Sequence, residues 1–207
     1  MLAALAGLLP PGVAVAAADP RRLHPLLPGE ALPGATAARL AEFSAGRDAA
    51  RRALVQIGAG GGAIPQRADR SPAWPAGVTG SITHSRTLCL AAVTRAHAGL
   101  GIDVEEDTPL AEELAVLVLS AGERRRLAVQ PDPGRAAKLA FSAKEAAYKA
   151  QYARSRRMLD FDAIELRLSR EGFRARLMVA AGPIPAGTFI AGRHTRIAGH
   201  LLTACVM

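Results

Sequence analysis

The sequence predicts an α+β fold built from a few helices and antiparallel strands. Some segments begin with the capping residues of helices, and others alternate apolar and polar residues as strands do. Helices mixed with antiparallel strands indicate an α+β architecture. The order strand, helix, strands occurs about once in each half of the 207 residues, which hints at a duplicated arrangement.

Three helices are expected from their starting residues. Thr36 is a favourable N-cap for a helix over residues 36–58. Ser120 and Glu123 have the spacing of a capping box, which begins a second, short helix. An Asp-Pro pair supplies the N-cap and first-position proline of a third helix, over residues 132–152.

Strands are expected where short apolar or alternating segments lie between turn residues. Residues 1–35 are rich in Pro, Leu and Gly and contain one such segment among loops. Gly58–Pro75 is a long loop, and a loop of this length in a compact domain is usually functional or disordered. The expected strands are Val13–Ala17, Leu88–Thr94, Leu100–Val104, Ile164–Leu168, Phe173–Val179 and Ile197–Val206.

The chain is basic. It has 26 Lys and Arg residues against 18 Asp and Glu, a net charge of +8, and nearly all of its basic residues are Arg. Such a surface attracts nucleotides, acidic proteins, nucleic acid or membranes, although the base composition of the genome explains the Arg excess equally well. The two cysteines, Cys89 and Cys205, lie in apolar runs without metal-ligand spacing and are expected to be buried thiols in a reducing compartment.

The segment 1–20 superficially resembles a signal peptide. The first basic residue of the chain is Arg21, so this segment lacks the positively charged start of a signal peptide. Pro10 and Pro11 interrupt the apolar run too early for a membrane span. We therefore expect an amino-terminal strand in a cytoplasmic protein without a membrane span, with a signal peptide as the alternative.

Two acidic clusters are candidate metal ligands. Asp103 and Glu105 are two residues apart on a strand, so their carboxylates share a face and suit Mg²⁺. Glu145 on the third helix is a further carboxylate, and Lys149 lies four residues later on the same face as a cation for a phosphate. The ordinary interpretations are an exposed acidic strand end and an exposed Glu-Lys helix pair.

Two more clusters are candidate anion contacts. His84 lies among small hydroxyl residues in the segment GSITHS. Arg47 and Arg51 are four residues apart on the polar side of the first helix and can reach one phosphate together. The ordinary interpretations are a structural histidine and a solvated basic helix face.

The four clusters belong to four longer segments that occur in a specific order. These are GRDAARRAL (Gly46–Leu54), RSPAWPAGVTGSITH (Arg70–His84), GIDVE (Gly101–Glu105) and FSAKEAAYK (Phe141–Lys149). Together they resemble the 4′-phosphopantetheinyl transferases, specifically the branch that activates enterobactin and surfactin synthetases, over roughly residues 40–165. The family tryptophan of the last segment is Phe141 here, an aromatic exchange at a position expected to pack beside the site.

The resemblance implies two similar α/β halves in a pseudo-twofold arrangement, residues 1–102 and 103–207. It implies transfer of the 4′-phosphopantetheine moiety of coenzyme A to a serine of an apo carrier protein, with release of 3′,5′-ADP. Mg²⁺, or alternatively Mn²⁺, would be held by Asp103, Glu105 and Glu145. Glu145 would also be the candidate general base, and Lys149 would stabilise charge on the pyrophosphate.

Coenzyme A is the implied co-substrate. Lys144 belongs to the family motif, but it precedes Glu145 by about 100° of helix rotation and is expected to face away from the metal in a lesser role. The implied contacts to coenzyme A are Arg47, Arg51, Arg70, Ser81, Thr83, His84, Lys144 and Lys149.

The expected partner is an acidic carrier protein or carrier domain, in siderophore or other nonribosomal peptide or polyketide biosynthesis, and the chain is expected to be a monomer. One alternative is a coenzyme A-dependent acyltransferase, which would need phosphate contacts but not three metal carboxylates. Another is a basic nucleic-acid-binding module, although no base-stacking motif is visible. A third, a non-catalytic family member, is disfavoured by the intact carboxylates and Lys149.

Overall fold

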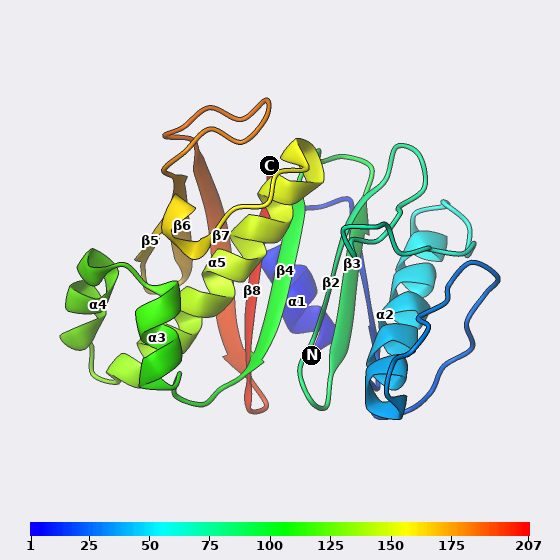
Figure 1. Cartoon of the computed structure of the whole chain (residues 1–207), viewed down its shortest axis with the longest axis horizontal. Helices are drawn as coiled ribbons and strands as arrows, with labels where there is room; N and C mark the ends of the chain where they lie inside the picture. The colour runs from blue at the N-terminus through cyan, green and yellow to red at the C-terminus, as the bar shows by residue number, and fades with distance from the viewer.

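The computed structural model describes residues 1–207 and contains two antiparallel sheets that lie side by side (Figure 1). The first sheet has the strand order β1-β3-β2, and the second has the order β4-β8-β7-β6-β5. The strands are β1 (Val13–Ala18), β2 (Thr79–His84), β3 (Cys89–Thr94), β4 (Leu100–Glu106), β5 (Ile164–Leu168), β6 (Gly172–Leu177), β7 (Phe189–Ile197) and β8 (His200–Val206). The fold is therefore α+β, as the sequence predicts.

Each sheet is covered by one long helix. The helices are α1 (Leu2–Leu8), α2 (Ala37–Gln56), α3 (Glu112–Val118), α4 (Ala121–Ala128) and α5 (Pro133–Ser155), with a 3₁₀ turn at Phe161–Ala163. In both halves a strand precedes the long helix, and that strand pairs with the last strand of its own half: β1 with β3, and β4 with β8. The two halves are thus similar in architecture, with α2 on the first sheet and α5 on the second (Figure 1).

The predicted helix starts are confirmed. Thr36 accepts a hydrogen bond from the backbone N–H of Arg39 at the start of α2. Both bonds of the Ser120–Glu123 capping box are present at the start of α4. Asp132 caps α5, with proline at the first helical position. These local signals act within one turn of the backbone, which is why the sequence alone reveals them.

The strand β4 is buried on both faces and lies at the junction of the two halves of the molecule. Ile102 and Val104 point into a core that also contains Leu5 of α1, on the side of the sheets away from α5. On the other face, a Cβ on Gly101 would lie 1.8 Å from the carbonyl oxygen of Ala146, so only glycine allows α5 to approach this closely. The carboxylates of β4 therefore lie directly against α5.

Four elements were not expected from the sequence. The short helix α1 is stabilised by burial of Leu5, which local propensity does not reveal. The segment of β2 contains glycine and hydroxyl residues that read poorly as a strand, yet it pairs with β3 along its whole length. The helix α3 and the strand β7 were also missed, and Ile197 ends β7 instead of beginning the last strand.

The boundary expected between residues 102 and 103 falls inside β4. This strand pairs with β8 from Leu100 to Glu106, so in the structure the second half begins at Leu100. All seven residues of β4 belong to one hydrogen-bonded ladder with β8, so they belong to the same half. None of the helices combines the length and apolarity that crossing a bilayer requires.

Candidate active site

The candidate site lies at the seam where β2 of the first sheet meets β4 of the second. These strands are not paired through a backbone ladder. Instead, the side-chain oxygen of Ser81 accepts the backbone N–H of Ile102 at 3.1 Å, and that of Thr83 accepts the N–H of Val104 at 3.2 Å. Ser81 and Thr83, expected to contact coenzyme A, therefore use their hydroxyl oxygens to join the two halves.

Asp103 is the centre of the site and is 4% exposed. Its Oδ1 accepts hydrogen bonds from Lys149 Nζ at 2.6 Å and from Thr83 Oγ1 at 2.9 Å. Its Oδ2 accepts one from Ser142 Oγ at 2.9 Å. Residues from β2 and α5 thus converge on one carboxylate of β4, and Lys149, expected to lie on the face of Glu145, also contacts Asp103.

Glu105 and Glu145 lie near this carboxylate. The Glu105 carboxylate is 3.1 Å from Lys138 Nζ, and its pKa is raised by burial and by the charge of Asp103, against the opposing effect of Lys138. Burial also raises the pKa of Glu145; Lys149 opposes that rise, and the charges of Asp103 and Glu105 add to it. None of the causes of this shift is a hydrogen bond to Glu145, so its carboxylate is available to a ligand.

Lys149 balances these negative charges. Burial opposes its charged form, but the charges of Asp103 and Glu145 outweigh that effect and raise its pKa. Its side chain is 24% exposed and faces the cavities described below. Lys149 therefore stays protonated and is accessible to a ligand.

The expected three-carboxylate metal cluster is not preformed. No three His, Cys, Asp or Glu side chains are close enough to hold a metal ion by themselves. The reason is that Lys149 and Lys138 neutralise Asp103 and Glu105 in the chain alone. The donor set still suits Mg²⁺, which usually takes one or two carboxylates and completes its shell with water and substrate phosphates. Burial is the main cause of the raised pKa values of Glu105 and Glu145, and the neighbouring carboxylates add to it, so a bound cation would favour the ionised forms.

A cationic pocket of about 310 Å³ opens onto Asp103 and Lys149. Its walls come from α2, from the loop between α2 and β2, and from β2. The basic residues that line it are Arg39, Arg47, Arg70, His84 and Lys149. The structure thereby brings together four residues expected to contact coenzyme A, Arg47, Arg70, His84 and Lys149. It adds Arg39, which was not expected from the sequence and which pairs with Glu42 of the same pocket at 3.0 Å.

Arg47 is the most informative residue of this pocket. The sequence places it on the polar side of α2, but it is only 4% exposed and its guanidinium stacks on Phe43 at 4.2 Å. Its Nε is the only buried side-chain nitrogen or oxygen in the chain without a hydrogen-bond partner, and burial lowers its pKa to about 10. An unpartnered guanidinium N–H at the wall of a cavity indicates a site for an anion.

Arg51 does not join Arg47. It pairs with Glu30, which is 2% exposed, and donates to the carbonyl oxygen of Pro25 at 2.6 Å. Glu30 also accepts the backbone N–H groups of Leu27 and Ile64, so this ion pair fastens two loops to α2. Arg51 does not line the cationic pocket and is held by a buried carboxylate that needs a cation, so this geometry does not support the expected contact with coenzyme A.

Lys144 lines the small cavity beside Glu145, but its ammonium group is held by other parts of the chain. It is 1% exposed, and its three N–H donors reach Glu123 at 2.8 Å, the carbonyl oxygen of Val118 at 3.0 Å and that of Phe161 at 2.9 Å. An ammonium group has three donors, so none is left for coenzyme A. Lys144 instead fastens α5 to α4, as its orientation away from the expected metal suggests.

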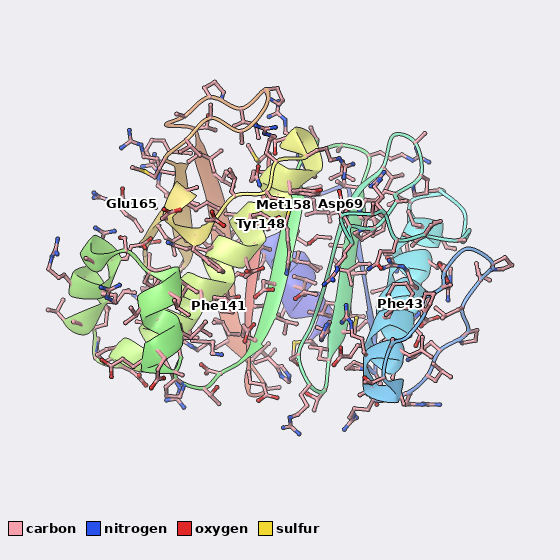
Figure 2. The ribbon with its side chains drawn as sticks, viewed as in Figure 1. Phe43, Asp69, Phe141, Tyr148, Met158 and Glu165 are labelled. Carbon is pink, nitrogen blue, oxygen red and sulfur yellow. The ribbon has the colours of Figure 1, made fainter.

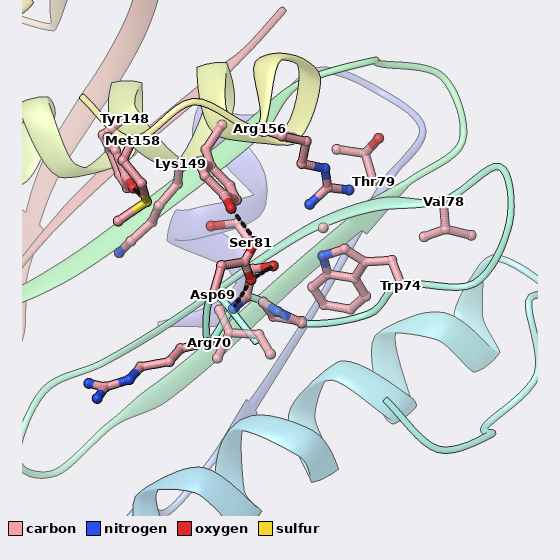
Figure 3. Close-up of a pocket in the computed structure, with 16 residues that line it drawn as sticks. Asp69, Arg70, Trp74, Val78, Thr79, Ser81, Tyr148, Lys149, Arg156 and Met158 are labelled. Atoms are coloured by element: carbon pink, nitrogen blue, oxygen red, sulfur yellow. Dashed lines mark hydrogen bonds between the residues drawn. The ribbon is translucent and has the colours of Figure 1, made fainter. Parts of the chain in front are cut away.

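Two further cavities continue from the cationic pocket. One of about 330 Å³ is lined by Trp74, Tyr148 and Met158 and shares Lys149 and Arg70 with the cationic pocket (Figure 3). Across it, Tyr152 of α5 donates a hydrogen bond to Asp69 on the loop of the first half. Figure 2 shows Asp69, Tyr148 and Met158 gathered between the two halves.

The last cavity is small and mostly apolar, with a volume of about 160 Å³. Glu145 lies in its wall beside Phe161, Leu159 and Ile164, and it shares Tyr148 and Met158 with the aromatic cavity. Phe141 packs against Phe161, with ring centroids 5.9 Å apart, and against the core under α5. The expectation that Phe141 is a packing residue is confirmed.

Comparison with protein families supplies the deciding observation. Residues 28–94 match the family model of the 4′-phosphopantetheinyl transferase N-terminal domain, and residues 99–196 match that of the 4′-phosphopantetheinyl transferase superfamily. This chain belongs to the 4′-phosphopantetheinyl transferase superfamily. The match of this transferase family covers the residues that build the seam, the cationic pocket and α5.

Individual members of the superfamily are also similar to the chain. It is 31% identical to the 4′-phosphopantetheinyl transferase PptT of Mycobacterium tuberculosis over 91% of this chain and 88% of that protein. It is 39% identical to the 4′-phosphopantetheinyl transferase Svp of Streptomyces mobaraensis over 74% of this chain, and 42% identical to enterobactin synthase component D of Salmonella typhimurium over 54%. The chain spans 65% of Svp and 48% of component D.

Proposed function

We propose that this chain transfers the 4′-phosphopantetheine moiety of coenzyme A to a serine of an apo carrier protein and releases 3′,5′-ADP. The observation that carries the proposal is the cationic pocket with the unpartnered Nε of Arg47, opening directly onto Asp103 and Lys149. Membership of the superfamily and the names of its members support the same reaction.

The series of cavities fits the parts of coenzyme A. Its nucleotide end carries the 3′-phosphate and suits the pocket lined by Arg39, Arg47 and His84. Its pantetheine arm is uncharged and suits the apolar cavity beside Glu145. Between these two ends, Lys149 is next to the position that the pyrophosphate would occupy.

Mg²⁺, or alternatively Mn²⁺, is proposed to be held by Asp103, Glu105 and Glu145 together with phosphate oxygens and water. Bound there, it would supply charge neutralisation of the pyrophosphate as a Lewis acid. Glu105 would exchange its contact with Lys138, 3.1 Å away, for this interaction.

The chain's own residues account for the remaining chemistry. The serine oxygen would form a bond to the β-phosphorus, and the bond from that phosphorus to the oxygen of 3′,5′-ADP would break. Glu145 is proposed to accept the serine proton, since it has no hydrogen-bond partner and its pKa is raised toward the working range of a general base. Lys149 would stabilise charge that develops on the phosphates.

An acidic carrier protein or carrier domain is the proposed partner, and the net charge of +8 would favour the encounter. The names of the relatives include enterobactin synthase component D, which supports a role in siderophore or other nonribosomal peptide or polyketide biosynthesis. We further propose that the chain acts as a monomer in the cytoplasm, where coenzyme A and apo carriers are available.

The test is intact-mass spectrometry of an apo carrier protein incubated with the chain, coenzyme A and Mg²⁺. We expect the carrier to gain the mass of one phosphopantetheine, and we expect that gain to disappear with a chelator or in Glu145→Gln. Transfer of an acyl group from acyl-coenzyme A that survives the chelator would instead indicate an acyltransferase. No gain on peptidyl, aryl and acyl carriers would contradict the proposal.

A further inference from the structure

A buried chain of hydroxyl groups surrounds Asp103, and the established family function does not explain it. Thr83 of β2, Ser142 of α5 and Thr203 of β8 are each at most 5% exposed. Thr83 and Ser142 contact the carboxylate directly, and Thr203 contacts Ser142. Three elements from both halves of the molecule thus contribute one hydroxyl each to the surroundings of a single side chain.

The direction of each hydrogen bond follows from the available donors. Thr83 Oγ1 already accepts the backbone N–H of Val104 at 3.2 Å, and its one proton is donated to Asp103 Oδ1. Thr203 Oγ1 lies 3.0 Å from the carbonyl oxygen and 2.9 Å from the Oγ of Ser142, and both of these can accept its proton. An ionised carboxylate only accepts hydrogen bonds, so the proton of Ser142 is donated to Asp103 Oδ2, 2.9 Å away.

These bonds leave one defined acceptor position on Asp103. A carboxylate has about four lone-pair sites, two on each oxygen. On Oδ1 both sites are taken, by Thr83 and by Lys149 at 2.6 Å. On Oδ2 Ser142 takes one site, and the other is free.

We propose that Ser142 is a positioning residue that orients the Asp103 carboxylate so that one lone pair of Oδ2 is presented to the divalent cation, with Thr203 setting the direction of the Ser142 hydroxyl. This proposal rests on the proposed function, because it concerns the metal site of that reaction. Ser142 precedes Glu145 by three residues, so the group that orients one proposed ligand lies on the same helix face as another.

The local sequence also supports a specific role for Ser142. A serine inside a helix commonly points to solvent or bonds back to the carbonyl one turn earlier, and the back-bond slightly destabilises the helix. Ser142 makes no such bond; its hydroxyl instead bridges Asp103 and Thr203. An alanine there would suit the run of buried alanines that packs α5 on β4, so packing alone does not require serine.

The test compares Mn²⁺ affinity in the wild type and in Ser142→Ala, measured by electron paramagnetic resonance on protein saturated with coenzyme A. We expect about a 10- to 100-fold weaker affinity, the usual effect of removing a hydrogen bond to a metal ligand. Coenzyme A affinity in the presence of chelator should stay within about twofold, because Ser142 does not line the cationic pocket. A general structural defect would lower both affinities.

Two further variants complete the experiment. Thr94→Val removes a buried hydroxyl of β3 that bonds the carbonyl oxygen of Gly12, far from Asp103, and should leave Mn²⁺ affinity unchanged. Thr203→Val should weaken Mn²⁺ binding, but by less than Ser142→Ala, and it provides the test should Ser142→Ala fail to fold. Absence of Mn²⁺ binding in the wild type would contradict the proposed function itself. Wild-type binding with equal affinity in the Ser142 and Thr203 variants would overturn only the positioning role.

Discussion

Lys149 Nζ lies 2.6 Å from Asp103 Oδ1, and this ion pair joins α5 to β4 at the seam between the two halves. Asp103 is almost completely buried, whereas the Lys149 side chain keeps 24% exposure toward the cavities. Asp103 therefore anchors the pair in the core, and Lys149 remains accessible to a ligand.

Replacing Lys149 by methionine should reduce catalysis far more than stability. We expect kcat/KM for carrier modification to fall by about 10²–10³-fold, the usual effect of losing one group that stabilises transition-state charge. The free energy of unfolding should fall by less than the about 3–5 kcal/mol of a fully buried pair, because Lys149 is partly exposed. Mass-spectrometric rates and urea denaturation measure the two effects.

The control is Arg154→Met, which removes an exposed cation from the same helix. A wild-type rate for Lys149→Met would refute the proposed role of Lys149 in catalysis.

The two neighbouring arginines of α2 should behave in opposite ways. Arg47→Gln should weaken coenzyme A binding by about 1.5–3 kcal/mol, the value of a hydrogen bond to a charged group, with little loss of stability. Arg51→Gln should lower the free energy of unfolding, because it leaves Glu30 buried without its cation, and should leave coenzyme A affinity unchanged. Isothermal titration calorimetry with coenzyme A and thermal unfolding distinguish the two. Equal losses of affinity in both variants would contradict this assignment.

Lys144 should matter for folding and not for coenzyme A. Lys144→Met leaves Glu123 buried without its ammonium partner and should cost about 3–5 kcal/mol of unfolding free energy. The double variant with Glu123→Gln removes the orphaned charge and should recover part of that loss. Chemical denaturation measures all three proteins. A single variant as stable as the wild type, or one that specifically loses coenzyme A affinity, would show that the buried pair has been misassigned.

The raised pKa of Glu145 predicts that ionisation of this side chain lowers the free energy of unfolding. Burial raises this pKa, so the folded chain binds the proton more tightly than the unfolded chain, and the free energy of unfolding falls as pH rises from the ordinary glutamate range through the raised value. Glu145→Gln lacks this titration, so its stability relative to the metal-free wild type should increase with pH across that window. Thermal unfolding of both proteins over a pH series tests this, and a constant difference would argue against a raised pKa.

The same titration should appear in metal binding with the opposite sign. Divalent cations bind the ionised carboxylates, so Mn²⁺ affinity in the presence of coenzyme A should fall as pH is lowered through the raised pKa values of Glu105 and Glu145. Affinity that stays constant until the ordinary glutamate range would contradict this expectation. Glu105→Gln serves as the comparison, because it leaves only one of the two raised carboxylates to titrate.

Much of the fold follows from short segments of sequence. The caps at Thr36, Ser120 and Asp132 act within one helical turn, and the structure confirms all three. The alternation of β4 also follows from its sequence, because successive side chains of a strand point to opposite faces. By contrast, α1 and β2 depend on Leu5 packing under the seam and on pairing with β3, and no local pattern reveals such contacts.

The sequence alone determined the family, the pairing of carboxylates on β4 and α5, and the positions from which a phosphate site could be built. Only the tertiary structure decided which of these residues are available. Arg47 and Arg51 are one helical turn apart on the same face of α2, yet Arg47 lines the cationic pocket and Arg51 is held by Glu30. Spacing sets the direction of a side chain within its own element, whereas burial and the nearest opposite charge come from segments distant in sequence.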